Sequence, residues 1–212
     1  MAKFIGILIL LGIIGAVMQE QDEKSGGSSN SGGNSAISTK TEKPTKPSIP
    51  ISDQQKEFIK IIKTFKGDYE KASNELKQSA VRVKRKKALA ELFGNNLSVQ
   101  FIGKIARLST TTEQNAYVEI KLLSTKIITI SNMNNELSDM DIGSLIKQGS
   151  SMYDTVADLD EGGKVKFSGT LLLGDADIGQ ADDYISEQSI TEGGSMEDPH
   201  FHIKFSSIEK IG

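Results

Sequence analysis

The 212-residue chain has no cysteine, no tryptophan and only two histidines. Without cysteine it forms no disulfide, offers no thiolate to a metal and has no site for a lipoprotein-type lipid. So few histidines and no tryptophan argue against a His-rich metal site or an aromatic cage. No catalytic signature is recognisable either. We therefore expect a protein that is not an enzyme, with no metal site and no cofactor.

Charge is divided unevenly along the chain. Residues 1–96 carry a net charge of +6 and residues 97–212 carry −9, which gives −3 overall. Contacts with phosphates dominate nucleic-acid affinity, so the acidic part is a poor polyanion binder. This distribution disfavours nucleic acid as a partner.

A continuous apolar run, Phe4–Met18, follows Lys3 near the N-terminus. As a helix it spans about 22 Å, which is short of the ~30 Å hydrocarbon core of a bilayer. Two interpretations remain, an uncleaved membrane anchor and a cleaved signal peptide. We favour the anchor, because Met18 stands where a signal peptidase needs a small residue.

The flanks of the apolar run indicate its orientation. Lys3 precedes it and the acidic segment Gln19–Glu23 follows it. The positive-inside rule then predicts a single-pass protein of the cytoplasmic membrane, with its N-terminus inside and its C-terminal domain outside. If the run is cleaved, the alternative is a secreted protein.

Residues 19–51 are rich in Gly, Ser, Pro and Lys and bury little apolar surface, so they predict a disordered linker. A helical segment is expected at 52–95. Ser52 and Gln55 have the spacing of a capping box, and Gly67 is expected to end the first helix. The expected apolar line of the second helix, about 68–93, is Tyr69, Ala72, Leu76, Ala80, Val83, Ala90 and Phe93.

A basic run lies inside this second helix, composed of Arg82, Lys84, Arg85, Lys86 and Lys87. One interpretation is a solvated helix face that offsets the acidic domain. The other is a contact for an acidic partner or for anionic lipid head groups. We nominate the five residues as candidate binding residues.

From residue 97 the apolar period changes from that of a helix to that of a strand. Strands are expected at 97–108, 117–122, 127–130, 164–173 and 201–208, with short helices within 141–159. This order predicts an α+β chain whose residues 96–212 form a five-stranded OB-fold-like barrel with one inserted helical segment. Gly169, inside the fourth strand, predicts a bulge.

Four segments carry a family resemblance: 74–80 (NELKQSA), 145–153 (LIKQGSSMY), 163–169 (GKVKFSG) and 189–196 (SITEGGSM). They resemble uncharacterised bacterial membrane-anchored proteins whose C-terminal domain is similar to the tRNA_anti-like OB-fold superfamily. The resemblance covers about residues 68–208. It implies the fold and a place in the bacterial cell envelope, but no activity and no tRNA binding.

Other candidate groups lie in and near the expected loop 174–198. Asp175, Asp177, Asp182 and Asp183 form an acidic cluster whose spacing does not fit an EF-hand, and we nominate them as binding residues. His200 and His202 share a strand face, and we expect ordinary surface histidines. Ser195 lacks a recognisable base. Asp139 and Asp141 read as charges at a helix N-terminus.

Together these features predict a non-catalytic binding module on the outer side of the cytoplasmic membrane. Its expected partner is an envelope protein or peptide. The alternative is a nucleic-acid-binding OB-fold protein that uses the basic residues 82–87.

Overall fold

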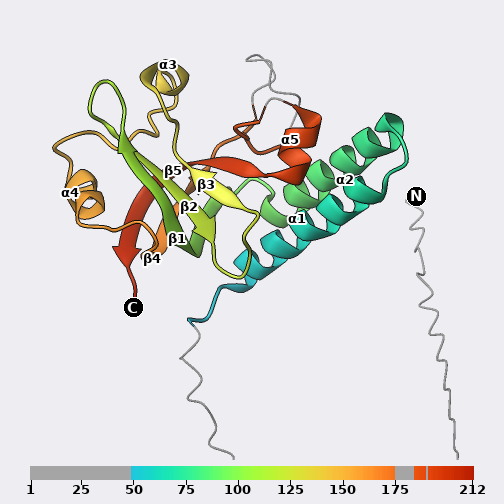
Figure 1. Ribbon diagram of the computed structural model, residues 1–212, viewed down its shortest axis with the longest axis horizontal. Helices are drawn as coiled ribbons and strands as arrows, with labels where there is room; N and C mark the ends of the chain where they lie inside the picture. The colour runs from blue at the N-terminus through green and yellow to red at the C-terminus, as the bar shows by residue number, and fades with distance from the viewer. Residues whose placement is uncertain (1–48, 175–183, 190) are drawn as a thin grey trace, which may run out of the picture. The chain divides into compact units, whose positions relative to one another are not determined.

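The computed structural model describes residues 49–174, 184–189 and 191–212 (Figure 1). Residues Pro47–Gly212 form one compact unit. The expected anchor Phe4–Met18 and the linker to residue 48 lie outside the described ranges. Within those ranges no helix has both the length and the apolar character needed to cross a bilayer.

Two helices come first, followed by three strands, two short helices, a strand, a short helix and a last strand. The helices are α1 (Asp53–Lys71), α2 (Glu75–Phe93), α3 (Glu136–Asp139), α4 (Ser151–Ala157) and α5 (Glu192–Glu197). The strands are β1 (Ser98–Thr110), β2 (Ala116–Leu122), β3 (Thr129–Ser131), β4 (Lys164–Leu171) and β5 (His200–Lys210).

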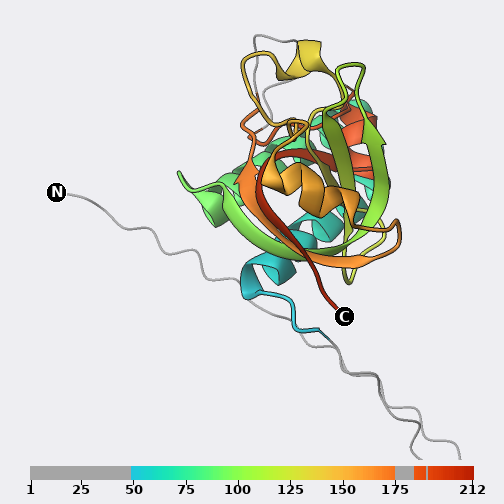
Figure 2. The ribbon, with the colours of Figure 1, turned by 90° about the vertical axis from the view of Figure 1, so that its left-hand side faces the viewer.

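The five strands close into a barrel in the order β1-β2-β3-β5-β4. The β3–β5 pair is parallel and the other pairs are antiparallel. This is a mixed, OB-like barrel, and it confirms the strand order expected from the sequence. Figures 1 and 2 show α4 at one end of the barrel and the hairpin of α1 and α2 at the other.

Alternating apolar residues fill the barrel interior, as the period of two requires. Phe101 of β1, Phe167 of β4 and Phe201 of β5 are fully buried. The rings of Phe101 and Phe167 meet edge to face, with their centroids 6.2 Å apart. The core therefore combines aromatic contacts between strands with a larger number of aliphatic side chains.

Helix α1 extends this core rather than lying beside it. Phe58 is fully buried, and its ring centroid lies 5.7 Å from that of Phe93, 5.7 Å from Phe101 and 5.2 Å from Phe201. One side chain thus joins α1, α2 and two strands. Because the helices and the barrel share a single hydrophobic cluster, the segment 52–95 is part of the barrel's folding unit.

Polar contacts fix the start of α1 to the edge of β1. Ser52 caps the helix as expected, accepting from the Gln55 amide at 3.1 Å. The Gln55 side chain does not complete a capping box. It is fully buried, donates to the carbonyl of Ile102 at 2.8 Å and accepts from the amide of Ile102 at 2.8 Å. Gln55 thereby satisfies a backbone edge that no strand covers.

The expectation of a short helix within 141–159 is confirmed by α4, but other helix expectations were wrong. Helix α1 runs through Gly67 to Lys71, and α2 begins only after its N-cap Asn74. Residues 141–150 contain no helix, and buried Asp139 instead accepts from the amide and hydroxyl of Ser144, both at 2.6 Å. Helix α5, in the region expected to be a loop, was missed because its two glycines hide a helical pattern.

The β4–β5 register shifts beside Gly169, between Ser168 and Gly169, but the extra residue of this bulge is Ser206 on β5 and not a residue of β4. A Cβ at Gly169 would lie 2.4 Å from the carbonyl oxygen of Lys204, so no side chain fits there. By contrast, a Cβ at Gly67, inside α1, would meet nothing within 4 Å.

The two glycines therefore predict opposite effects of the same substitution. Gly169→Ala should lower the free energy of unfolding by about 1–3 kcal/mol through overpacking. Gly67→Ala should raise the free energy of unfolding by about 0.5–1 kcal/mol, because alanine has a higher helix propensity than glycine. Urea unfolding of both variants checks this, and a destabilised Gly67→Ala or an unaffected Gly169→Ala would contradict the packing described.

Candidate functional site

The structure divides the five candidate basic residues of α2 into different environments. Lys84 and Lys87 are exposed, Arg82 and Lys86 are half-buried, and Arg85 is buried with 2% of its surface exposed. The run is therefore not one solvated face, and only part of it is available to a partner. The other candidates, Asp175, Asp177, Asp182 and Asp183, lie outside the described residues.

Arg85 forms a buried ion pair that joins distant parts of the chain. Its guanidinium donates to the Glu187 carboxylate at 2.5 Å and to the carbonyl of Ser195 at 2.7 Å. Glu187 is as buried as Arg85. The pair connects α2 to the 184–189 segment and to α5, so its position indicates a structural role.

The sequence hid this role because the expected apolar line of α2 was wrong. Leu76 and Val83 belong to that line, yet they are 85% and 63% exposed. The buried face carries Arg85, Leu89 and Phe93 instead, spaced four residues apart. An arginine in a core-facing position looks like a surface residue until its distant carboxylate partner is known.

Removing one member of a buried ion pair leaves the other charge buried without a partner, which typically destabilises the fold by about 3–5 kcal/mol. We expect Arg85→Met to lower the free energy of unfolding by about that amount. The double variant Arg85→Met/Glu187→Met should be more stable than Arg85→Met alone. The exposed neighbour Lys84→Met serves as the control and should stay within about 0.5 kcal/mol of the parent. Urea unfolding would contradict the pair's role if Arg85→Met matched this control.

The two histidines share one face of β5, as expected, with ring centroids 6.2 Å apart. They are not ordinary surface residues. His202 is 6% exposed and its Nδ1 lies 3.0 Å from the Ser186 hydroxyl, while His200 Nε2 lies 2.7 Å from the Ser131 hydroxyl. Burial, together with the neighbouring His200, lowers the pKa of His202 to about 4, and burial also lowers the pKa of His200.

The Ser195 hydroxyl is engaged by groups other than the two histidines. It donates to the carbonyl of Glu192 at 3.2 Å and lies 3.4 Å from the Arg85 guanidinium. Within the part of the chain that the structure describes, no three His, Asp or Glu side chains gather closely enough to hold a metal ion.

The lowered pKa of His202 predicts acid sensitivity. Its folded pKa, about 4, lies below the unfolded value near 6.5, so protons bind the unfolded chain more tightly. The stability that neutral His202 contributes is present above pH 6.5 and is lost as pH falls towards 4. Between pH 7 and 5 we expect a loss of about 2 kcal/mol, since each pKa unit corresponds to about 1.4 kcal/mol.

His202→Gln is the matched comparison, because glutamine keeps a polar side chain near Ser186 but does not bind a proton in this pH range. The free energy of unfolding of this variant should change less between pH 7 and pH 5, a range that lies mostly above the pKa values of ordinary carboxylates. Urea unfolding at pH 7, 6 and 5 measures the difference, and parallel curves for parent and variant would contradict the buried neutral state.

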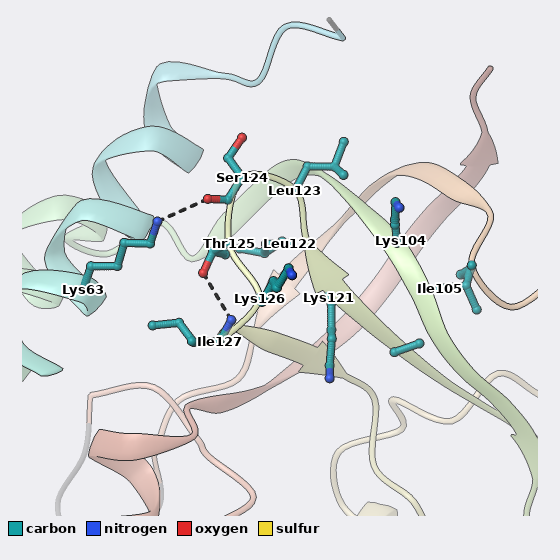
Figure 3. Close-up of a pocket in the computed structure, with 12 residues that line it drawn as sticks. Lys63, Lys104, Ile105, Lys121, Leu122, Leu123, Ser124, Thr125, Lys126 and Ile127 are labelled. Atoms are coloured by element: carbon teal, nitrogen blue, oxygen red, sulfur yellow. Dashed lines mark hydrogen bonds between the residues drawn. The ribbon is translucent and has the colours of Figure 1, made fainter.

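A lysine pocket, defined here as the cavity edged by Lys63, Lys104, Lys121 and Lys126, lies where β1, β2 and the loop 123–127 meet (Figure 3). Its volume is about 750 Å³, within the ~300–1,000 Å³ typical of small-molecule sites. Its walls are aliphatic. No acidic residue and no aromatic residue is among the residues that line it.

Four parts of the chain supply the lysines of this pocket. Lys104 is on β1, Lys121 lies near the end of β2 and Lys126 is in the loop, while Lys63 reaches across from α1. The Lys63 ammonium donates to the carbonyl of Ser124 at 3.2 Å, and Ser124 itself has φ of 71°. Helix α1 thus supports the loop at a residue whose backbone conformation is rare for residues other than glycine.

Like charges oppose one another directly beside this pocket. In the sheet register Lys104 stands between Lys121 of β2 and Lys164 of β4. Directly opposed like charges on one sheet face are destabilising. The neighbouring pair on the same two strands, Arg107 and Glu119, has opposite charges. The arrangement around Lys104 is therefore suited to attract an anion.

Sequence reasoning missed the lysine pocket because its four lysines come from positions scattered between 63 and 126. Each is unremarkable as a single surface lysine, and only the barrel register brings them together. No family model matches this chain, and no curated protein or solved structure matches it.

Proposed function

We propose that this protein is a membrane-anchored, non-catalytic binding module whose OB-like barrel faces the outer side of the cytoplasmic membrane. The lysine pocket is its ligand site. The observation that carries the proposal is an open cavity with a cationic edge on a domain that is otherwise acidic.

The division of the chain supports this role because the compact unit begins at Pro47, near the end of the expected linker 19–51. A tether of about 30 residues has a reach on the order of 30 Å, so the domain stays near the bilayer but reorients freely. The resemblance to membrane-anchored bacterial proteins agrees with this placement.

The polar groups that suggest catalysis are engaged in contacts of structural character. Ser195 contacts Arg85, His202 contacts Ser186 and His200 contacts Ser131. These contacts join separate segments of the chain. They support a binding function over hydrolysis.

A second contact surface is the exposed part of α2, where Lys84 and Lys87 accompany the exposed Leu76 and Val83. It suits an envelope protein partner. Nucleic acid is less well supported as a ligand, because no lining residue of the lysine pocket offers an aromatic ring for base stacking.

The absence of cysteine gives a clean test of topology. We expect a full-length Thr112→Cys variant, exposed in the turn after β1, to react with a membrane-impermeant maleimide in intact cells. An Ala2→Cys variant should react only after permeabilisation, because the positive-inside rule puts it in the cytoplasm. The reverse pattern, or labelled protein recovered only in the medium, would overturn the anchored, outward-facing arrangement.

A further inference from the structure

We propose that the lysine pocket binds an anionic amphiphile, meaning a single aliphatic chain that ends in a phosphate or a carboxylate. This inference rests on the proposed function in taking the pocket for a binding site, and it adds the chemical class of the ligand. It follows from the combination of a cationic edge with aliphatic walls in one cavity.

The four lysines at the edge of the pocket favour a ligand with an anionic group. None of the four lysines forms an ion pair with any other described residue, and Lys104 directly opposes both Lys121 and Lys164. No described carboxylate therefore lies within ion-pair distance of these four ammonium groups. An anion bound at this edge reduces the repulsion among the lysines and accepts a hydrogen bond from the ammonium group that it meets, which is strong when both groups are charged.

The walls favour an aliphatic chain as the ligand's other part. Ile105 and Leu122 belong to the buried core, and the half-buried Ala106, Leu123 and Ile127 complete the apolar part of the lining. A simple inorganic anion does not cover this apolar surface, and a base or a sugar matches it poorly. Burial of each methylene contributes roughly 0.8 kcal/mol, which corresponds to about a fourfold gain in affinity.

The pocket is held open by contacts that do not involve the proposed ligand. Ala106 is the extra residue where the β1–β2 register shifts between Ile105 and Arg107, and this bulge widens the strand edge beside Gly162. On the opposite side the bond from Lys63 to Ser124 holds the 123–127 loop against α1. The cavity therefore exists before a ligand enters.

The test uses the full-length protein in nanodiscs of zwitterionic lipid, with octyl phosphate as the probe. Lysines are acylated briefly and the extent of reaction at each is read by mass spectrometry. We expect octyl phosphate to protect Lys104, Lys121 and Lys126 at least severalfold. Lys84 and Lys87, exposed on α2, serve as internal controls and should react unchanged.

Two further probes each carry only one part of the proposed ligand. Inorganic phosphate carries the anion without the chain, and octyl glucoside carries the chain with an uncharged head. Both should protect at least tenfold less well than octyl phosphate at equal concentration. Butyl phosphate should also be at least tenfold weaker, because it has four fewer methylenes to bury.

Two double variants, each of which removes two positive charges, test where the probe binds. In Lys104→Gln/Lys121→Gln, protection of Lys126 by octyl phosphate should be lost, while urea unfolding shows that the variant is folded. In Lys84→Gln/Lys87→Gln, protection of Lys126 should be retained. A third arm replaces part of the nanodisc lipid by a single-chain anionic lipid, hexadecyl phosphate, without any other probe. Protection there identifies bilayer lipid as the source, and its absence identifies a free amphiphile; both results support the ligand class.

The proposal is overturned if octyl phosphate protects no lysine, or if it protects Lys84 and Lys87 equally. It is also overturned if inorganic phosphate or octyl glucoside protects as well as octyl phosphate, since either result removes one half of the ligand. Cysteine labelling is independent of these outcomes. An outward-facing domain with an unprotected pocket would leave the proposed location standing and remove only the ligand.

Discussion

The insertion of Phe58 into the end of the barrel is the contact on which the rest of this structure depends. Its ring meets Phe93, Phe101 and Phe201, which belong to α2, β1 and β5. An isolated helical hairpin of this length has little stability of its own, because helices in proteins are stabilised mainly by tertiary packing. Here that packing comes from the barrel, which in turn has one end closed by the hairpin.

The same helix connects packing to function. Phe58 packs α1 against the end of the barrel. The Gln55 side chain fixes the start of α1 to β1, because it hydrogen-bonds both the amide and the carbonyl of Ile102. Five residues after Phe58, Lys63 then reaches the 123–127 loop and donates to Ser124. The lysine pocket is thus a consequence of how the core is assembled, because its edge on one side is supplied by the helix that closes the barrel.

Much of the fold follows from local sequence patterns. The period of two leads to the strand order, Gly169 marks the place of the β4–β5 register shift, and Ser52 marks the start of α1. What local patterns do not contain is the partner of each polar side chain. Arg85 reads as one basic residue in a surface run until the fold brings Glu187 against it. The same limit applies to Gln55, whose spacing indicates a capping box but whose amide binds a strand.

The candidate site is harder still to recognise from the sequence, because a register between strands decides it. Lys104 and Lys121 are far apart in the chain, and only the pairing of β1 with β2 sets them side by side. Such a pair costs stability, and proteins commonly keep destabilising groups where function requires them. The central claim is therefore that the lysines around Lys104 are retained at the expense of stability for the sake of a ligand.

The most direct measurement of that claim compares the urea unfolding of the parent with that of Lys104→Gln at low and at high salt. The account predicts that Lys104→Gln is more stable by about 0.2–1 kcal/mol at low salt, and that the difference shrinks when salt screens the exposed charges. Arg107→Gln, which removes an oppositely charged pairing on the same strands, should be less stable than the parent. A Lys104→Gln variant that is less stable than the parent at low salt would contradict the account, because the lysine would then be a structural element and not a group kept for binding.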